Sequence, residues 1–135
     1  MNSRFTPDRQ ALVGTVLTCA VAAVLLLDAA MQLAAPAPLI AAMEHTGFPT
    51  HAAPLLAVVM TVCAITLLIP RTSILGAILT TGFFGGAIAI HVRIGEIAAP
   101  SQIACLLMGV TVWAGIYLRH PRLRDLLRSR AHSAH

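Results

Sequence analysis

The stretch that decides the fold is residues 70–95, PRTSILGAILTTGFFGGAIAIHVRIG. It opens on Pro70-Arg71-Thr72, continues without a charged residue from Ser73 to Ile90, and closes on His91 and Arg93. A helix of about 18 residues is about 27 Å long, which is close to the hydrocarbon thickness of a bilayer. The stretch therefore predicts a helix that spans a membrane.

The composition of the whole chain agrees with this prediction. Its 135 residues are 58% hydrophobic and 10% charged, with a mean hydropathy of +0.84. A soluble domain would need a polar surface that this chain lacks. All nine basic residues are arginines, and most lie in the terminal segments without interleaved aromatic residues. This pattern excludes a nucleic-acid-binding protein and favours contact with lipid, with anionic lipid at the Arg-rich tail.

Working outward from residues 70–95, proline-containing breaks separate three more apolar runs. We expect an all-α membrane protein, an antiparallel four-transmembrane-helix bundle with helices at about 11–35, 52–69, 73–92 and 101–118. The expected organisation is an N-terminal segment (1–10), a single transmembrane domain (11–120) and a basic tail (121–135). The first run is longer than a signal-peptide core and contains Asp28, so we expect it to remain as a span. Residues 39–45 are expected to form a short helix at the interface.

The arginines predict the orientation of these spans. With four spans, both termini and the loop at Arg71 share one side of the membrane. That side carries Arg4, Arg9, Arg71, Arg119, Arg122, Arg124, Arg128 and Arg130, and the other carries Arg93 alone. The positive-inside rule then places both termini in the cytoplasm.

Small residues on helix 73–92 predict where it packs. Gly82 and Gly86 have GxxxG spacing on one face, and Gly76 lies on another with Thr80 and His91. Membrane helices associate through such close approaches. We expect Gly76, Gly82 and Gly86 to be packing positions inside the bundle, with a homo-oligomer as the alternative for the GxxxG pair.

Asp28 is the acid within the apolar runs, where an acid generally faces the bundle interior. Gly14, Thr18, Val21, Leu25, Asp28 and Gln32 repeat at spacings of three and four, so they share one helix face. We expect that face to point inward and to form a polar cluster in the outer half of the bundle. The candidate members are Asp28, Gln32, Glu44, His91, Arg93 and Gln102, and the outer loops add His45, His51 and Glu96.

Several roles for this cluster remain open. Asp28 is satisfied by His91 or Gln32 and fixes helix register, or the acid and the histidine form a small-molecule or proton-handling site. A metal site would need Glu44, His45, His51 and His91, whose spacing matches no recognised pattern, so no metal is expected. Cys19, Cys63 and Cys105 are isolated and form no CxxC motif.

The chain also resembles a known family over about residues 10–125. The residues that carry the resemblance are Asp28, Met43 to Pro49, Ile69-Pro70-Arg71-Thr72, Leu75 to Leu79, Gly82, Gly85-Gly86-Ala87, His91-Val92-Arg93 and Leu118 to Leu123. They are similar to the DoxX-like family of small bacterial membrane proteins, which is named after a subunit of a thiosulfate–quinone oxidoreductase. The chain departs from the family pattern at Gln32, where a basic residue is expected, and near Met60, where an acid is expected.

The resemblance implies a four-helix protein of the bacterial inner membrane. We expect an accessory or ligand-binding component, with a quinone or a lipid as the ligand and a redox subunit as a candidate partner. The alternatives are a small proton-coupled transporter or membrane enzyme that uses Asp28 and His91, and a purely structural bundle. No catalytic residue is identified, and a non-enzymatic role is favoured.

Overall fold

The computed structural model describes residues 7–121 and 123. Helices make up the regular structure of these residues. They are α1 (Pro7–Ala34), α2 (Ala37–His45), the 3₁₀ turn η1 (Thr50–Ala52), α3 (Ala53–Leu68), α4 (Ser73–Arg93) and α5 (Pro100–Arg119). Within the described residues, four helices are long and apolar enough to cross a membrane: α1, α3 extended by η1, α4 and α5. The protein is therefore an all-helical, multi-pass membrane protein.

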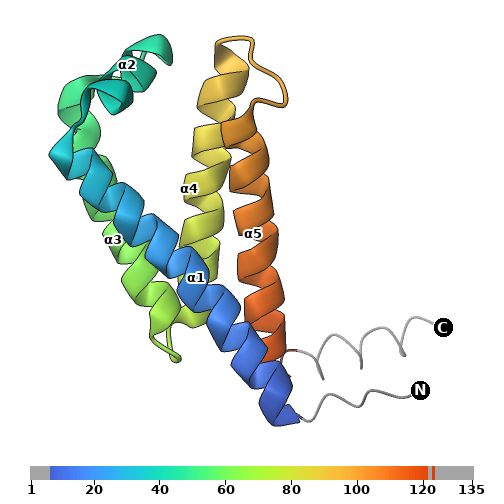
Figure 1. Cartoon of the computed structure of the whole chain (residues 1–135). Helices are drawn as coiled ribbons and strands as arrows, with labels where there is room; N and C mark the ends of the chain where they lie inside the picture. Colours follow the sequence, from blue (N-terminus) through green and yellow to red (C-terminus); the bar gives the residue numbers. More distant parts are fainter. Residues whose placement is uncertain (1–6, 122, 124–135) are drawn as a thin grey trace.

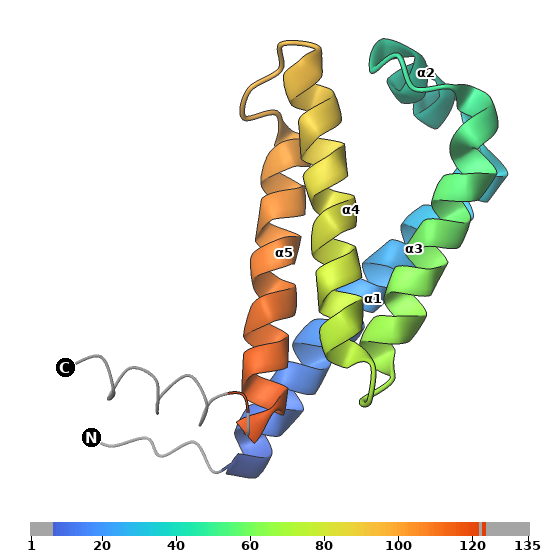
Figure 2. The ribbon, with the colours of Figure 1, turned by 180° about the vertical axis from the view of Figure 1, so that it is seen from behind.

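The four long helices pack in a ring in the order α1, α3, α4, α5, and α5 closes the ring against α1. In Figure 1 the chain rises through α1, descends through α3, rises through α4 and descends through α5. The α1–α3 pair and the α4–α5 pair meet at the end that carries the α3–α4 turn and separate toward the other end (Figures 1 and 2). We call these the narrow end and the wide end. The short helix α2 lies at the wide end.

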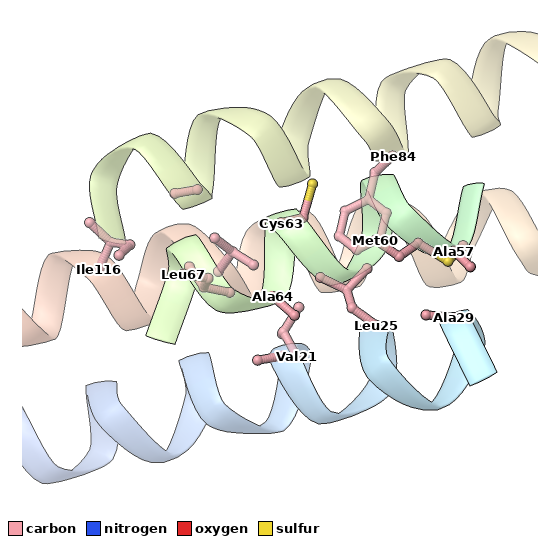
Figure 3. Packing of buried hydrophobic residues seen from close by; sticks show 13 residues of the cluster. Val21, Leu25, Ala29, Ala57, Met60, Cys63, Ala64, Leu67, Phe84 and Ile116 are labelled. Atoms are coloured by element: carbon pink, nitrogen blue, oxygen red, sulfur yellow. The ribbon is translucent and has the colours of Figure 1, made fainter. Parts of the chain in front are cut away.

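The core follows from the spacing of the inward residues on each helix. Figure 3 shows Val21, Leu25 and Ala29 of α1 facing Ala57, Ala64 and Leu67 of α3. Phe84 of α4 and Ile116 of α5 belong to the same cluster. Many large apolar side chains outside it are exposed, including Leu12, Val58, Ile78 and Leu107. Lipid is the solvent that suits such a surface.

Glycines bring the backbones into contact at the narrow end. A Cβ atom added at Gly14 would lie 2.6 Å from the carbonyl oxygen of Gly115, and one at Gly76 would lie 2.3 Å from the backbone nitrogen of Leu67. Side chains reinforce these crossings, because the Arg119 guanidinium donates to Thr18 Oγ1 over 2.9 Å. The two helix pairs are therefore clamped together at this end.

Gly82 and Gly86 do not pack against a neighbouring helix, although the sequence predicted that they would. A Cβ added at either position would meet no atom within 4 Å. The reason is geometric: both lie on the part of α4 that has separated from the α1–α3 pair. Of the three predicted packing glycines, only Gly76 contacts a neighbouring helix within the described chain.

Two helix boundaries also differ from the expected ones. Helix α1 begins at Pro7 rather than near residue 11, because proline is well suited to the first turn of a helix. Helix α2 is a continuous helix of 9 residues. It ends in a Schellman turn, in which Phe48 N–H donates to the Met43 carbonyl and Gly47 adopts a φ of +66°. Most of the basic tail (122 and 124–135) lies outside the described residues, and so does the predicted lipid contact there.

Candidate functional site: a cavity at the wide end

A cavity of about 600 Å³ lies between the two separated helix pairs. All five α-helices contribute to its lining, from Val24 of α1 to Met108 of α5. Apolar side chains dominate its walls, among them Leu25, Met60 and Phe84. Few polar groups interrupt this lining. A large apolar cavity with a few polar side chains is typical of a small-molecule site.

The α1 wall supplies two polar groups without partners. Asp28 and Gln32 are four residues apart, so they lie one above the other on the same helix face. Asp28 is half-buried, and within the described chain no hydrogen bond or ion pair reaches its carboxyl group. Gln32 is 7% exposed, and its Oε1 atom is buried without a hydrogen-bond partner. Buried polar groups are normally satisfied, so this pair is the feature of the cavity that most needs a ligand to explain it.

The opposite rim is a closed hydrogen-bond network around Glu96. His45 Nε2 lies 2.9 Å from Glu96 Oε1, and His91 Nδ1 lies 2.5 Å from Glu96 Oε2. An ionised carboxylate can only accept, so both ring nitrogens must carry the proton and donate. The other ring nitrogen of His91, Nε2, lies 3.0 Å from Ser101 Oγ. We call His45, His91, Glu96 and Ser101 the rim cluster.

The rim cluster joins three separate elements. His45 ends α2, His91 lies in the last turn of α4 and Ser101 in the first turn of α5, while Glu96 lies in the loop between α4 and α5. Hydrogen bonds from His45 and then from His91 hold the pKa of the Glu96 carboxyl below its ordinary value. The carboxylate is thus kept ionised and accepting over a wide range of pH.

Arg93 and Gln102 support this rim through the backbone. Arg93 Nη2 donates to the Thr46 carbonyl oxygen over 2.8 Å. Gln102 Oε1 accepts from Ala99 N–H, and Gln102 Nε2 donates to the Glu96 carbonyl oxygen over 3.2 Å. Gln102 therefore caps the start of α5 and holds the loop that carries Glu96.

Comparison with known proteins identifies the family. The sequence profile of the DoxX-like family matches residues 16–115. The chain belongs to the DoxX-like family. A search of the curated proteins and a search of the solved structures returned no match.

The cavity of this DoxX-like protein gathers only part of the predicted cluster. Asp28, Gln32 and His91 line it. Glu44 is exposed and forms no part of the lining, and Arg93 and Gln102 are engaged by backbone groups outside it. Asp28 and His91 share the cavity without bonding to each other, because both ring nitrogens of His91 are occupied by Glu96 and Ser101.

The rim cluster of the DoxX-like protein joins polar residues that the sequence predicted, His45, His91 and Glu96, with Ser101, which it did not single out. His45 and Glu96 fall in loops or loop ends, and Ser101 begins a helix, so no periodicity relates them. The contact between His91 and Glu96 could have been predicted from their spacing, because the acid follows five residues after the histidine with Gly95 between them. In the structure Gly95 adopts a φ of +83°, which turns the chain back toward His91. Among the described residues, no group of three or more His, Cys, Asp and Glu side chains is arranged to hold a metal ion.

Proposed function

We propose that this DoxX-like protein binds a small lipophilic molecule of the quinone class in the cavity at the wide end. The observation that carries the proposal is the pair of unpartnered polar groups, Asp28 and Gln32, in a largely apolar cavity of about 600 Å³. An ionisable group inside a membrane helix costs about 2.5–3.5 kcal/mol on insertion scales, and such residues usually mark functional sites.

The chemistry of the cavity suits a ring with polar substituents. The Gln32 amide offers both a donor and an acceptor, and the Asp28 carboxyl accepts when ionised and donates when protonated. A quinone ring carries carbonyl oxygens that accept hydrogen bonds, and its reduced form carries hydroxyls that donate them. The apolar walls formed by residues such as Met60 and Phe84 would enclose the ring. The resemblance to a family named after a quinone-reducing complex makes this the first ligand class to test, and an accessory role in such a complex follows as part of the proposal.

The proposal includes an orientation in the inner membrane. Arg71 lies in the turn at the narrow end, and Arg93 lies at the wide end. The arginine distribution along the sequence therefore supports a cytoplasmic narrow end, with both termini inside. The cavity then lies in the outer half of the bilayer.

Two adjacent glycines of α4 provide a matched test. Gly86 lines the cavity, whereas Gly85 lies beside a second hollow between α4 and α5. At both positions a Cβ meets open space. Gly86→Leu should therefore fill the cavity and Gly85→Leu should not, while both change the helix propensity equally.

The measurement is photo-crosslinking with an azido-ubiquinone analogue, followed by mapping of the labelled peptides by mass spectrometry. We expect labelling of peptides from α1 and α4 that face the cavity, and a loss of about tenfold in Gly86→Leu, which corresponds to about 1.4 kcal/mol. Gly85→Leu should label like the unmodified protein. Equal labelling of the two variants, or labelling spread over lipid-facing peptides, would contradict the proposal.

A further inference from the structure

Helix α2 covers the wide end of the bundle and is held there by few contacts. It contributes Ala42, Met43 and His45 to the cavity lining, and the turn that follows it contributes Phe48. Met43 is 6% exposed, so it fills space beneath the helix. Of the described elements, α2 packs closely only against η1, which is its neighbour in sequence. Figures 1 and 2 show α2 at the end of the α1–α3 pair, across from the end of α4.

The connection from α2 to α4 consists of polar bonds at one end of the helix. His45 donates to Glu96, and the carbonyl of Thr46 accepts from Arg93. His91 anchors the same Glu96 carboxylate to α4. At the other end, α2 is joined to α1 through Ala35, whose φ of +43° marks a sharp change of direction between the two helices. The chain also continues from α2 through residues 46–49 into η1. Helix α2 therefore has a short loop at each end and only polar bonds to α4, so loss of these bonds lets it move away from α4 with the two loops as hinges.

We propose that α2 is a lid over the cavity and that the Glu96 carboxylate, bridging His45 to His91, is the latch that holds it closed. The lid regulates access to the cavity. The lid proposal rests on the proposed function only for the identity of the molecule that enters the cavity.

The latch depends on pH through the groups that surround Glu96. The charged and titratable groups on the elements that border it are His45 and Glu44 on α2, His91 and Arg93 on α4, and Asp28 on the α1 wall. Helix α5 presents only the uncharged Ser101 and Gln102 at this rim.

The pKa of Glu96 decides whether the latch is strengthened or lost at lower pH. Its pKa is held below the ordinary value of 4.5 by its bonds to His45 and His91. The latch is therefore complete above that ordinary value, and it is lost as the pH falls through the lowered pKa of the folded protein. The lid therefore stays closed above pH 4.5 and opens only below it.

The lid can be tested without a ligand by pulsed electron paramagnetic resonance. Spin labels at Ala41→Cys on α2 and Ile103→Cys on α5 report the distance between lid and bundle, because both residues are exposed. Cys19, Cys63 and Cys105 are replaced by alanine in this background. Glu96→Ala and His45→Ala should each shift the distance distribution to longer values. Glu44→Ala, a change on the same helix at an exposed carboxylate, should leave it unchanged.

His45→Ala keeps the test decisive if Glu96→Ala fails to fold, because the His45 side chain is 66% exposed and its removal leaves no cavity in the core. Distance distributions in His45→Ala and Glu96→Ala that coincide with that of Glu44→Ala would overturn the lid. The same holds if only His45→Ala can be compared and its distribution is unchanged.

A second measurement separates the lid from the proposed ligand. Release of bound ubiquinone-1 into empty liposomes should be about tenfold faster from His45→Ala, the factor expected when one hydrogen bond to a charged group is lost. Longer label distances without quinone binding in any variant would support the lid and overturn the quinone. Unchanged distances with normal quinone binding would overturn the lid and leave the quinone proposal standing.

Discussion

His120 closes the narrow end of the bundle, where its Nε2 atom lies 2.9 Å from Ser73 Oγ. Partial burial, and then the neighbouring Arg119, hold the pKa of His120 below its ordinary value of 6.5. The folded protein therefore takes up this proton at lower pH than the unfolded chain does. The contribution of His120 to stability is complete above pH 6.5, and it is lost as the pH falls through the lowered pKa of the folded state.

Thermal unfolding in detergent tests this effect. Lowering the pH from about 7.5 to about 5.5, across the histidine range, should lower the Tm of the unmodified protein. His120→Gln removes the titrating group and should reduce that decrease. His51→Gln, at an exposed histidine on η1, is the matched control and should leave the pH dependence unchanged. An identical pH dependence in all three proteins would contradict the prediction.

Asp28 is the residue whose location the sequence predicted best. Its position on an apolar helix predicted an inward-facing acid, and the structure places it on the cavity wall. The bond to His91 that the sequence suggested is not formed in the structure, because helical spacing relates residues on one helix and not across two. An unpartnered carboxyl group lowers stability, so Asp28→Leu should raise the free energy of unfolding in detergent by about 1–3 kcal/mol while quinone labelling is lost. Destabilisation by this variant would show that Asp28 has a partner in the folded protein.

The glycines give the clearest test at the scale of helix packing. Gly14→Ala and Gly76→Ala place a Cβ against backbone atoms of the neighbouring helix, so each should destabilise the protein by about 1–3 kcal/mol. Gly82→Ala and Gly86→Ala meet open space, so each should be neutral or stabilise α4 by about 0.5–1 kcal/mol. Unfolding of the four variants in sodium dodecyl sulfate measures the differences. Equal effects at all four positions would contradict the packing described above.

The same glycines show why the sequence predicts helices better than it predicts their contacts. Spacing on α1 correctly assigned Thr18, Leu25 and Gln32 to an inward face, because polar residues marked that face. On α4 two faces carried small residues, and periodicity could not tell which of them meets a neighbour. Gly76 and Thr80 are buried in the bundle, while Gly82 and Gly86 are exposed and line the cavity. The choice depends on the angle between helix pairs, and the angle is a property of the whole bundle.

The orientation of the whole molecule in the membrane gives a further prediction. Cysteines introduced at Arg71 and at Ile97 lie at opposite ends of the bundle, and both positions are exposed. In a background without native cysteines, a membrane-impermeant maleimide should label Ile97→Cys in intact cells and Arg71→Cys only after the membrane is opened. The reverse pattern would contradict a cytoplasmic narrow end.

The separation of the helix pairs also shapes how the molecule displaces lipid. Because the pairs are clamped through Gly14, Gly76 and Gly115 at one end and spread apart at the other, the protein has the form of a wedge (Figure 2). Its cross-section is larger in the leaflet that holds the cavity than in the opposite leaflet. A flat bilayer is strained when it surrounds a protein whose cross-section differs between the two leaflets. A bilayer that is convex on the cavity side is strained less. The protein should therefore concentrate in regions of that curvature, so its splayed helices act on the shape of the membrane as well as enclosing a site.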